Sequence, residues 1–234
     1  MCTMQTTLDD THPVFEACRT GDYDVVEKFL AEGGSVYAES EYNPAIFGIA
    51  ACHGHKHILE LMLRYGLDIS RSHNRFGSSV AEFAIKRDSV EWLEYFLSLG
   101  VSVDHLTDTG HGLAELAAAG GKTKCLEILI HKGAKLEERS RTGGTAFFEA
   151  ARNNQVAALE ILHRAGANRE ARDGDQNTPL IIAAKAGKFE AVEWLLYHGA
   201  DIHAQDERGK TALDWAKANG HQKIVELLIS RMGF

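Results

Sequence analysis

One position recurs along the chain at steps of 33 or 34 residues, and this regularity restricts the fold more than any other feature. The residues at this position are, in order, Gly21, Gly54, Asp88, Gly121, Asn154, Gly187 and Gly220. A period of this length, kept over six steps, indicates a solenoid in which one supersecondary unit stacks on the next. Glycine adopts a left-handed backbone freely, and Asn and Asp tolerate it best among the other residues. We therefore predict a tight turn between two helices at each of these positions.

The stretches on either side of this turn have the patterns of two different helices. Twelve residues after most of the turns comes a second set of glycines, which suit helix C-caps: Gly33, Gly66, Gly100, Gly133, Gly166 and Gly199. Between turn and cap, apolar residues such as Val25-Val26 and Phe29-Leu30 follow the i, i+3, i+4 spacing of one buried stripe. The helix before the turn carries small residues, for example Ala117-Ala118 and Ala183-Ala184, which let neighbouring units approach closely.

Five short motifs add a resemblance to this pattern: Thr178-Pro179-Leu180, Gly187-Lys188, Gly199-Ala200-Asp201, Gly54-His55 and Gly220-His221. With them, about residues 9–234 resemble the ankyrin repeat family. The resemblance implies an all-α solenoid of helix pairs with outward β-hairpin fingers, in a single domain over residues 1–234. The expected repeats are about 9–41, 42–74, 75–108, 109–141, 142–174, 175–207 and 208–234. The family's finger asparagine is replaced here by Tyr37, Ser70, Asp104, Glu137, Glu170 and His203.

The composition indicates which kinds of partner the chain binds and in which compartment it is expected. The chain has 25 Lys and Arg against 33 Asp and Glu, a net charge of −8, and no basic block, so a nucleic-acid backbone is not an expected partner. No apolar run approaches membrane-spanning length, and the first residues lack the features of a signal peptide. The four cysteines contain no Cys-x-x-Cys pair, which indicates reduced thiols. We therefore expect a cytoplasmic monomer that binds no membrane.

A metal site is the first chemical alternative. Cys52-His53-Gly54-His55-Lys56-His57 supplies residue types that bind zinc. Gly54 reverses the chain in the middle of this run, however, so these side chains would have to converge across a turn between helices. We predict no bound metal and no cofactor.

Acid–base catalysis is the second alternative. Glu82 and Glu115 occupy equivalent positions in adjacent repeats and could face each other across the concave side of the solenoid. Other repeats also have an acidic residue near the start of the helix that precedes the turn. The last turns of these helices carry bases: Arg19, Lys86, Arg87, Arg152 and Lys185. Acids first and bases last complement the helix dipole, and local pairs such as Glu149–Arg152 add to this. The same bases could form a strip along the concave wall that docks a partner's carboxylates. With no catalytic triad and no phosphate loop in the sequence, we do not expect an enzyme.

The finger tips and the ends of the inner helices are the predicted binding surface, because loops on a rigid scaffold carry specificity. Aromatic and arginine side chains dominate interface hot spots, which makes Tyr42 and Phe76 at finger tips notable. The predicted partner-binding residues are Tyr37, Glu41, Tyr42, Cys52, His53, Arg75, Phe76, Lys86, Arg87, Asp108, His111, Arg141 and Arg152.

Charge is distributed unevenly along the chain. Residues 1–110 carry 17 acidic and 8 basic side chains, whereas residues 111–234 are nearly balanced at a net +1. Three hypotheses follow. The first is a non-enzymatic scaffold that binds one protein through the fingers and concave wall of repeats 2 to 5. The second is an inhibitor or immunity-type protein whose acidic half neutralises a basic toxin or enzyme. The third is a metal-dependent or acid–base enzyme.

Overall fold

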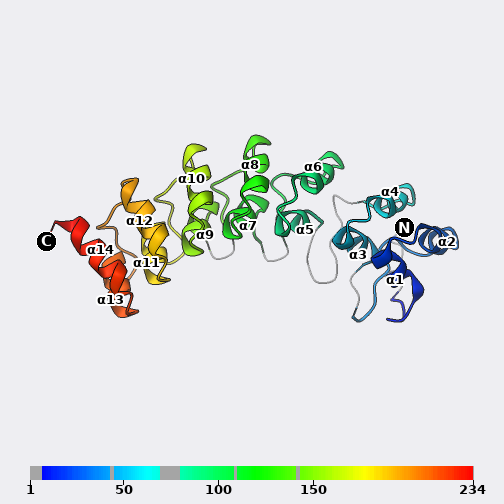
Figure 1. The fold of residues 1–234 in the computed structure, drawn as a ribbon, viewed down its shortest axis with the longest axis horizontal. Coiled ribbons are helices and arrows are strands. Elements are labelled where there is room, and N and C mark those ends of the chain that lie inside the picture. The colour runs from blue at the N-terminus through cyan, green and yellow to red at the C-terminus, as the bar shows by residue number, and fades with distance from the viewer. Residues whose placement is uncertain (1–6, 43–44, 69–79, 108–109, 141–142, 234) are drawn as a thin grey trace. The chain divides into compact units, whose positions relative to one another are not determined.

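The regular secondary structure of the described residues consists of α-helices joined by turns and loops. The computed structural model describes residues 7–42, 45–68, 80–107, 110–140 and 143–233, and these contain fourteen helices (Figure 1). The helices are α1 (Pro13–Thr20), α2 (Tyr23–Ala31), α3 (Ile46–His53), α4 (Lys56–Arg64), α5 (Val80–Lys86), α6 (Val90–Ser98), α7 (Leu113–Ala119), α8 (Thr123–His131), α9 (Ala146–Arg152), α10 (Val156–Arg164), α11 (Pro179–Lys185), α12 (Phe189–Tyr197), α13 (Ala212–Ala218) and α14 (Gln222–Met232). None of these helices has both the length and the apolar character needed to cross a bilayer.

The chain divides into two compact units, which are described separately. The first comprises Met1–Ala84 with Trp92–Ser102, and the second comprises Ile85–Glu91 with Val103–Phe234. In the first unit α1 packs on α3 and α2 packs on α4, around fully buried side chains such as Phe15, Phe47 and Ile58. Asp22 begins α2 by accepting a hydrogen bond from the Val25 N–H at 3.3 Å.

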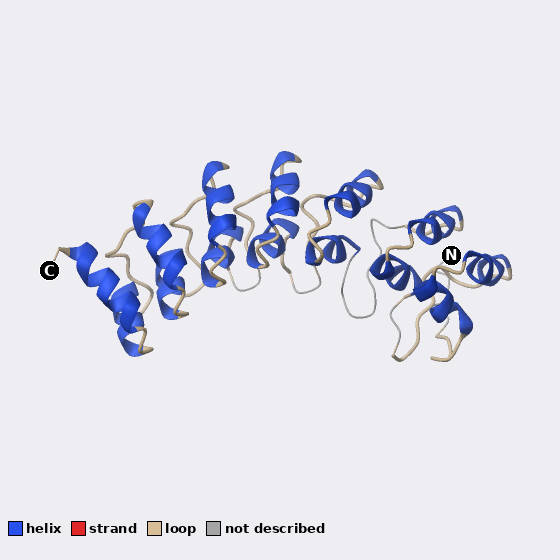
Figure 2. Cartoon of the chain, viewed as in Figure 1, coloured by secondary structure: helices blue, strands red, loops and turns tan. Residues whose placement is uncertain are grey.

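The second unit is a row of helix pairs. The first helix of each pair, here called the inner helix, packs on the next inner helix from α7 through α9 and α11 to α13. The second, outer helices α8, α10, α12 and α14 pack in a parallel series (Figure 2). Buried alanines in the inner helices, among them Ala117, Ala150 and Ala183, allow this close approach. The fold class is therefore an all-α repeat solenoid.

The predicted left-handed turns are confirmed. All seven residues at the recurring position have φ between 51° and 81°, and the six cap glycines have φ between 76° and 97°. Which residue occupies a turn depends on the next helix pair. A Cβ at Gly187 would lie 2.6 Å from the His221 ring, so any side chain there would have to displace that ring. Asn154 instead uses its Oδ1 to accept a hydrogen bond from the Ala191 N–H of α12 at 2.9 Å. Asp88 accepts from the Cys125 N–H of α8 in the same way at 3.0 Å.

The expected β-hairpin fingers are not shown by the structure. Within the described residues, the extended pairings are the isolated bridges Thr7–Glu39 and Leu106–Gly112. The side chains that replace the family's finger asparagine nevertheless join successive segments. Tyr37 accepts from the Asp68 N–H at 2.8 Å, Glu137 from the Asn168 N–H at 2.8 Å, and Glu170 from the Asp201 N–H at 3.1 Å. Asp104 makes the equivalent bond to the Lys135 N–H at 2.9 Å. At these four positions, therefore, a hydroxyl or carboxylate oxygen accepts from the backbone of the next segment.

Candidate functional site

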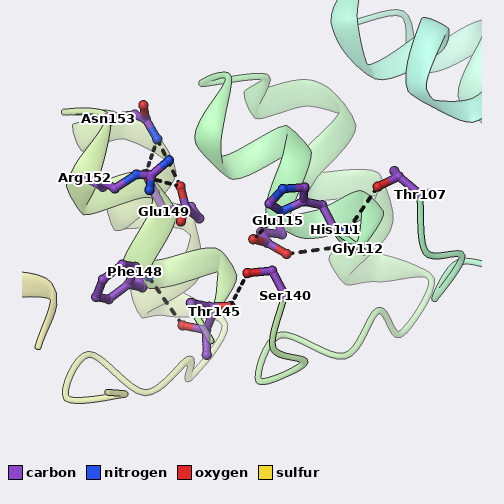
Figure 3. Close-up of polar contacts among 11 residues, drawn as sticks. Thr107, His111, Gly112, Glu115, Ser140, Thr145, Phe148, Glu149, Arg152 and Asn153 are labelled. Carbon is purple, nitrogen blue, oxygen red and sulfur yellow. Dashed lines mark hydrogen bonds and ion pairs between the residues drawn. The ribbon is translucent and has the colours of Figure 1, made fainter. Parts of the chain in front are cut away.

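Two buried glutamates on neighbouring inner helices organise the most distinctive polar site of the second unit (Figure 3). We call His111, Glu115, Glu149, Arg152 and Asn153 the inner-helix charge cluster. Glu115 lies in the first turn of α7 and is 4% exposed, and Glu149 lies in the middle of α9 and is 3% exposed. Carboxylates are seldom so deeply buried unless they are paired or hydrogen-bonded, so the partners of each oxygen decide what the cluster can do.

Both oxygens of Glu115 have partners. The residue that begins α7 is Gly112, which has no side chain to cap the helix. Glu115 is the third residue of α7 and accepts a hydrogen bond from the Gly112 N–H on Oε2 at 3.3 Å, as the glutamate of a capping box does. Its Oε1 lies 2.8 Å from His111 Nδ1. The buried carboxylate therefore fixes both the start of α7 and the orientation of the His111 ring.

Glu149 is less well satisfied. Its Oε2 pairs with Arg152 Nε at 3.1 Å and accepts from Asn153 Nδ2 at 3.3 Å. Its Oε1 is buried without a hydrogen-bond partner in the described part of the chain. Burial raises the pKa of Glu149; the Arg152 guanidinium opposes this increase, and the nearby charge of Glu115 adds to it.

The solvent-facing parts of the cluster are a guanidinium and an imidazole rather than carboxylates. The Arg152 side chain is 48% exposed and the His111 side chain 30% exposed, whereas both glutamates are covered. A general acid or base must reach the proton that it transfers. Buried carboxylates whose accessible partners are Arg152 and His111 are instead suited to holding two surface side chains in fixed positions.

The residues predicted from the sequence fall into four groups. His111 and Arg152 lie in the charge cluster. In the first unit, Tyr42 is 74% exposed and Glu41 is exposed, and Cys52 and His53 are exposed at the end of α3. Tyr37 is half-buried, its ring edge-on to Phe47. Lys86 and Arg87 are exposed at the end of α5. Four predicted residues lie outside the described residues: Arg75, Phe76, Asp108 and Arg141.

Two histidines at the start of α4 form contacts with the backbone of the preceding helix pair, α1 and α2. His55 Nε2 lies 2.8 Å from the Arg19 carbonyl oxygen, and His57 Nε2 lies 3.1 Å from that of Gly21. The His53 and His55 rings are stacked with centroids 6.4 Å apart. These ring nitrogens are engaged by the backbone, and no group of three or more potential ligands among the described residues is placed to hold a metal ion.

Sequence reasoning identified Arg152 and His111 but missed that Glu115 and Glu149 are buried beneath them. The available signal was the position of Glu115, three residues after Gly112, where the glutamate of a capping box accepts from the N–H of the N-cap residue. The burial of Glu149 had no such signal, because it depends on packing between neighbouring helix pairs.

Comparison with known proteins assigns the family. A family model described as ankyrin repeats (3 copies) matches residues 114–206 and, overlapping these, 147–234, which together make up more than half of the chain. No curated protein matches the sequence. Ankyrin repeats generally mediate protein–protein interaction and are typically non-enzymatic. The helix pairs, the left-handed turns and the family match agree, and the chain belongs to the ankyrin repeat family.

Proposed function

We propose that this ankyrin repeat protein is a non-enzymatic scaffold that holds one protein partner on the inner-helix face of its second unit and on the adjoining finger segments. The observation that carries the proposal is the inner-helix charge cluster, in which buried carboxylates hold Arg152 and His111 at the surface.

Fixed side chains favour binding because their conformational entropy has already been lost on folding. Ordering a flexible side chain at an interface costs about 0.5–1.5 kcal/mol, and a pre-organised arginine avoids much of this. Arginine is also among the residues most enriched at interface hot spots.

The experiment compares two arginines that form similar ion pairs on opposite faces. Arg152 pairs with Glu149 on inner helix α9, and Arg164 pairs with Glu160 at 3.4 Å on outer helix α10. A partner is first captured with the whole chain, and its affinity for R152A and R164A is then measured by biolayer interferometry. We expect R152A to weaken binding at least about tenfold, as for a hot-spot residue. R164A is expected to change the affinity less than about twofold. Equal affinities of R152A and the unchanged chain would contradict the proposal.

A second candidate function is inhibition of a basic toxin or enzyme. It is supported by the acidic side chains of α1 and α2, of which Glu16, Asp24 and Glu27 are exposed. The captured partner separates the two functions. An inhibitor must abolish the partner's own activity in the complex. If the partner keeps full activity in the complex, inhibition is ruled out and the scaffold function remains.

We further propose a cytoplasmic, monomeric protein. The support for the compartment is that Cys18, Cys52 and Cys125 are thiols that form no disulfide bond with one another. Burial raises the pKa of Cys18 and of Cys125 to about 12, which favours the protonated thiol.

A further inference from the structure

A second group of side chains on the inner-helix face brings two lysines to one aromatic ring. Lys185, the last residue of α11, has its Nζ 4.1 Å from the centroid of the Trp215 ring on α13. Lys210, just before α13, has its Nζ 5.4 Å from the same centroid. We call Lys185, Lys210 and Trp215 the lysine–tryptophan patch.

A hydrogen bond to Asp206 holds the Trp215 ring in place. Its Nε1 donates to Asp206 Oδ2 at 2.8 Å. Oδ1 of the same carboxylate accepts from the N–H groups of Arg208 and Lys210, both at 2.9 Å. Burial alone would raise the pKa of Asp206, but these hydrogen bonds outweigh it and lower the pKa. Asp206 therefore stays ionised, and its oxygens face the turn and the indole.

The lysine backbones are also fixed. The carbonyl oxygen of Lys185 accepts from Asn219 Nδ2 at 2.8 Å and lies 3.3 Å from His221 Nε2. The hydrogen bond from the Lys210 N–H to Asp206 holds the other lysine. Neither ammonium group forms an ion pair within the described residues.

The other nearby acid is also engaged. Asp214 accepts from the N–H of Thr211 at 2.9 Å and from its hydroxyl at 2.7 Å, in the capping box at the start of α13. These bonds lower its pKa, with smaller contributions from the charges of Lys210 and Lys217. The patch thus presents two cations next to a tryptophan whose position is fixed by hydrogen bonds. The carboxylates of Asp206 and Asp214 already form hydrogen bonds within the fold.

We propose that the lysine–tryptophan patch binds a carboxylate side chain from an acidic segment of the protein partner. This inference rests on the proposed function, since it assigns chemistry to one end of the same inner-helix face. Neither ammonium group has an acidic partner among the described residues, so a carboxylate of the partner would supply the missing counter-charge. The indole attracts each cation toward its face and orients it for this contact.

A protein carboxylate fits the patch better than a nucleic-acid backbone does. Binding to a polyanion depends on many phosphate contacts, and the patch offers only two lysines. Two lysines are enough for one or two acidic side chains.

The test uses fluorescein-labelled hexaglutamate as the probe and fluorescence anisotropy as the readout. The variants are K185Q, K210Q and K185Q/K210Q. The matched control is K124Q, which removes the same charge from an exposed site on outer helix α8. We expect each single substitution to weaken binding about threefold and the pair about tenfold, as for partly exposed ion pairs. K124Q is expected to bind within about twofold of the unchanged chain. Identical affinities of K185Q/K210Q and K124Q, or no binding of the peptide to the unchanged chain, would overturn the inference.

Two further measurements address general anion binding and loss of folding in the variants. Inorganic phosphate that displaces the peptide at equal concentration would identify a general anion site and overturn the assignment to a protein carboxylate. Thermal unfolding followed by circular dichroism shows whether each variant is folded, and the single variants keep the test valid if the pair is not.

The captured partner distinguishes failure of this inference from failure of the proposed function. If R152A weakens partner binding but hexaglutamate does not bind, the inference fails and the proposed function stands. If hexaglutamate binds through the lysines but R152A leaves partner affinity unchanged, the proposed function fails instead.

Discussion

At the scale of the residue, Glu115 and Glu149 are two glutamates with nearly the same burial that differ in how many of their carboxylate oxygens have hydrogen-bond partners. Glu115 has a partner for each oxygen, His111 and the Gly112 N–H, so its charge is well satisfied. Glu149 leaves one oxygen without a partner in the described part of the protein. An unsatisfied buried polar atom reduces stability, and such atoms persist most readily where function requires them. Here the unsatisfied carboxylate holds Arg152 at the surface.

This difference predicts an effect of pH on the free energy of unfolding. The pKa of Glu149 is higher in the folded chain than in the unfolded chain, so the folded state holds the proton more strongly between the two values. Stability from this group is present at low pH and is lost as the pH rises through the folded pKa. Relative to the unchanged chain, E149Q should therefore gain stability from about pH 4 to about pH 7.

Urea unfolding of E149Q and the unchanged chain across this range measures the effect. E127Q, which replaces an exposed carboxylate on outer helix α8, serves as the control. A difference between E149Q and the unchanged chain that stays constant with pH, or that changes in the opposite direction, would contradict this account of Glu149.

At the scale of the element, the left-handed turns could be predicted and the contacts that fix their sequence could not. The glycine period identifies the turn because few residues adopt positive φ. It does not say that Gly187 faces the His221 ring, or that Asn154 reaches the Ala191 N–H. Those contacts depend on which residue the next helix pair brings to the turn.

Two glycine substitutions separate backbone strain from crowding. Gly187 and Gly133 both have positive φ, but a Cβ at Gly133 would have open space around it. G133A should cost about 1–2 kcal/mol of unfolding free energy from strain alone. G187A should cost about 1–3 kcal/mol more, because its Cβ displaces His221 from the Lys185 carbonyl.

Urea unfolding checks both values, and G187A/H221A tests the cause, since the smaller side chain should remove the extra cost of the methyl group. Equal costs for G187A and G133A would show that the His221 contact contributes nothing.

At the scale of the whole molecule, a repeat chain is a series of near-equivalent helix pairs, and its function depends on the positions where they differ. The period predicts the fold because each pair must bury one face on its neighbours. It does not predict the site. The pattern places Glu149 and Lys185 at surface-type positions, yet one is buried and the other converges with Lys210 on Trp215. Side-chain burial on the inner helices depends on the particular residues of the neighbouring helix pairs. The repeat period does not contain this information, because it records only what the repeats have in common.

The inner and outer helices of the second unit offer alternative binding faces, and hydroxyl-radical footprinting compares them in one experiment. His111 and Trp215 report on the inner-helix face, and Tyr197, 76% exposed on α12, reports on the outer face. The chain is oxidised alone and in complex with its captured partner, and each residue is quantified by mass spectrometry. We predict that the partner protects His111 and Trp215 and leaves Tyr197 as reactive as before. Protection of Tyr197 with unchanged oxidation of His111 and Trp215 would contradict the assignment of partner binding to the inner-helix face.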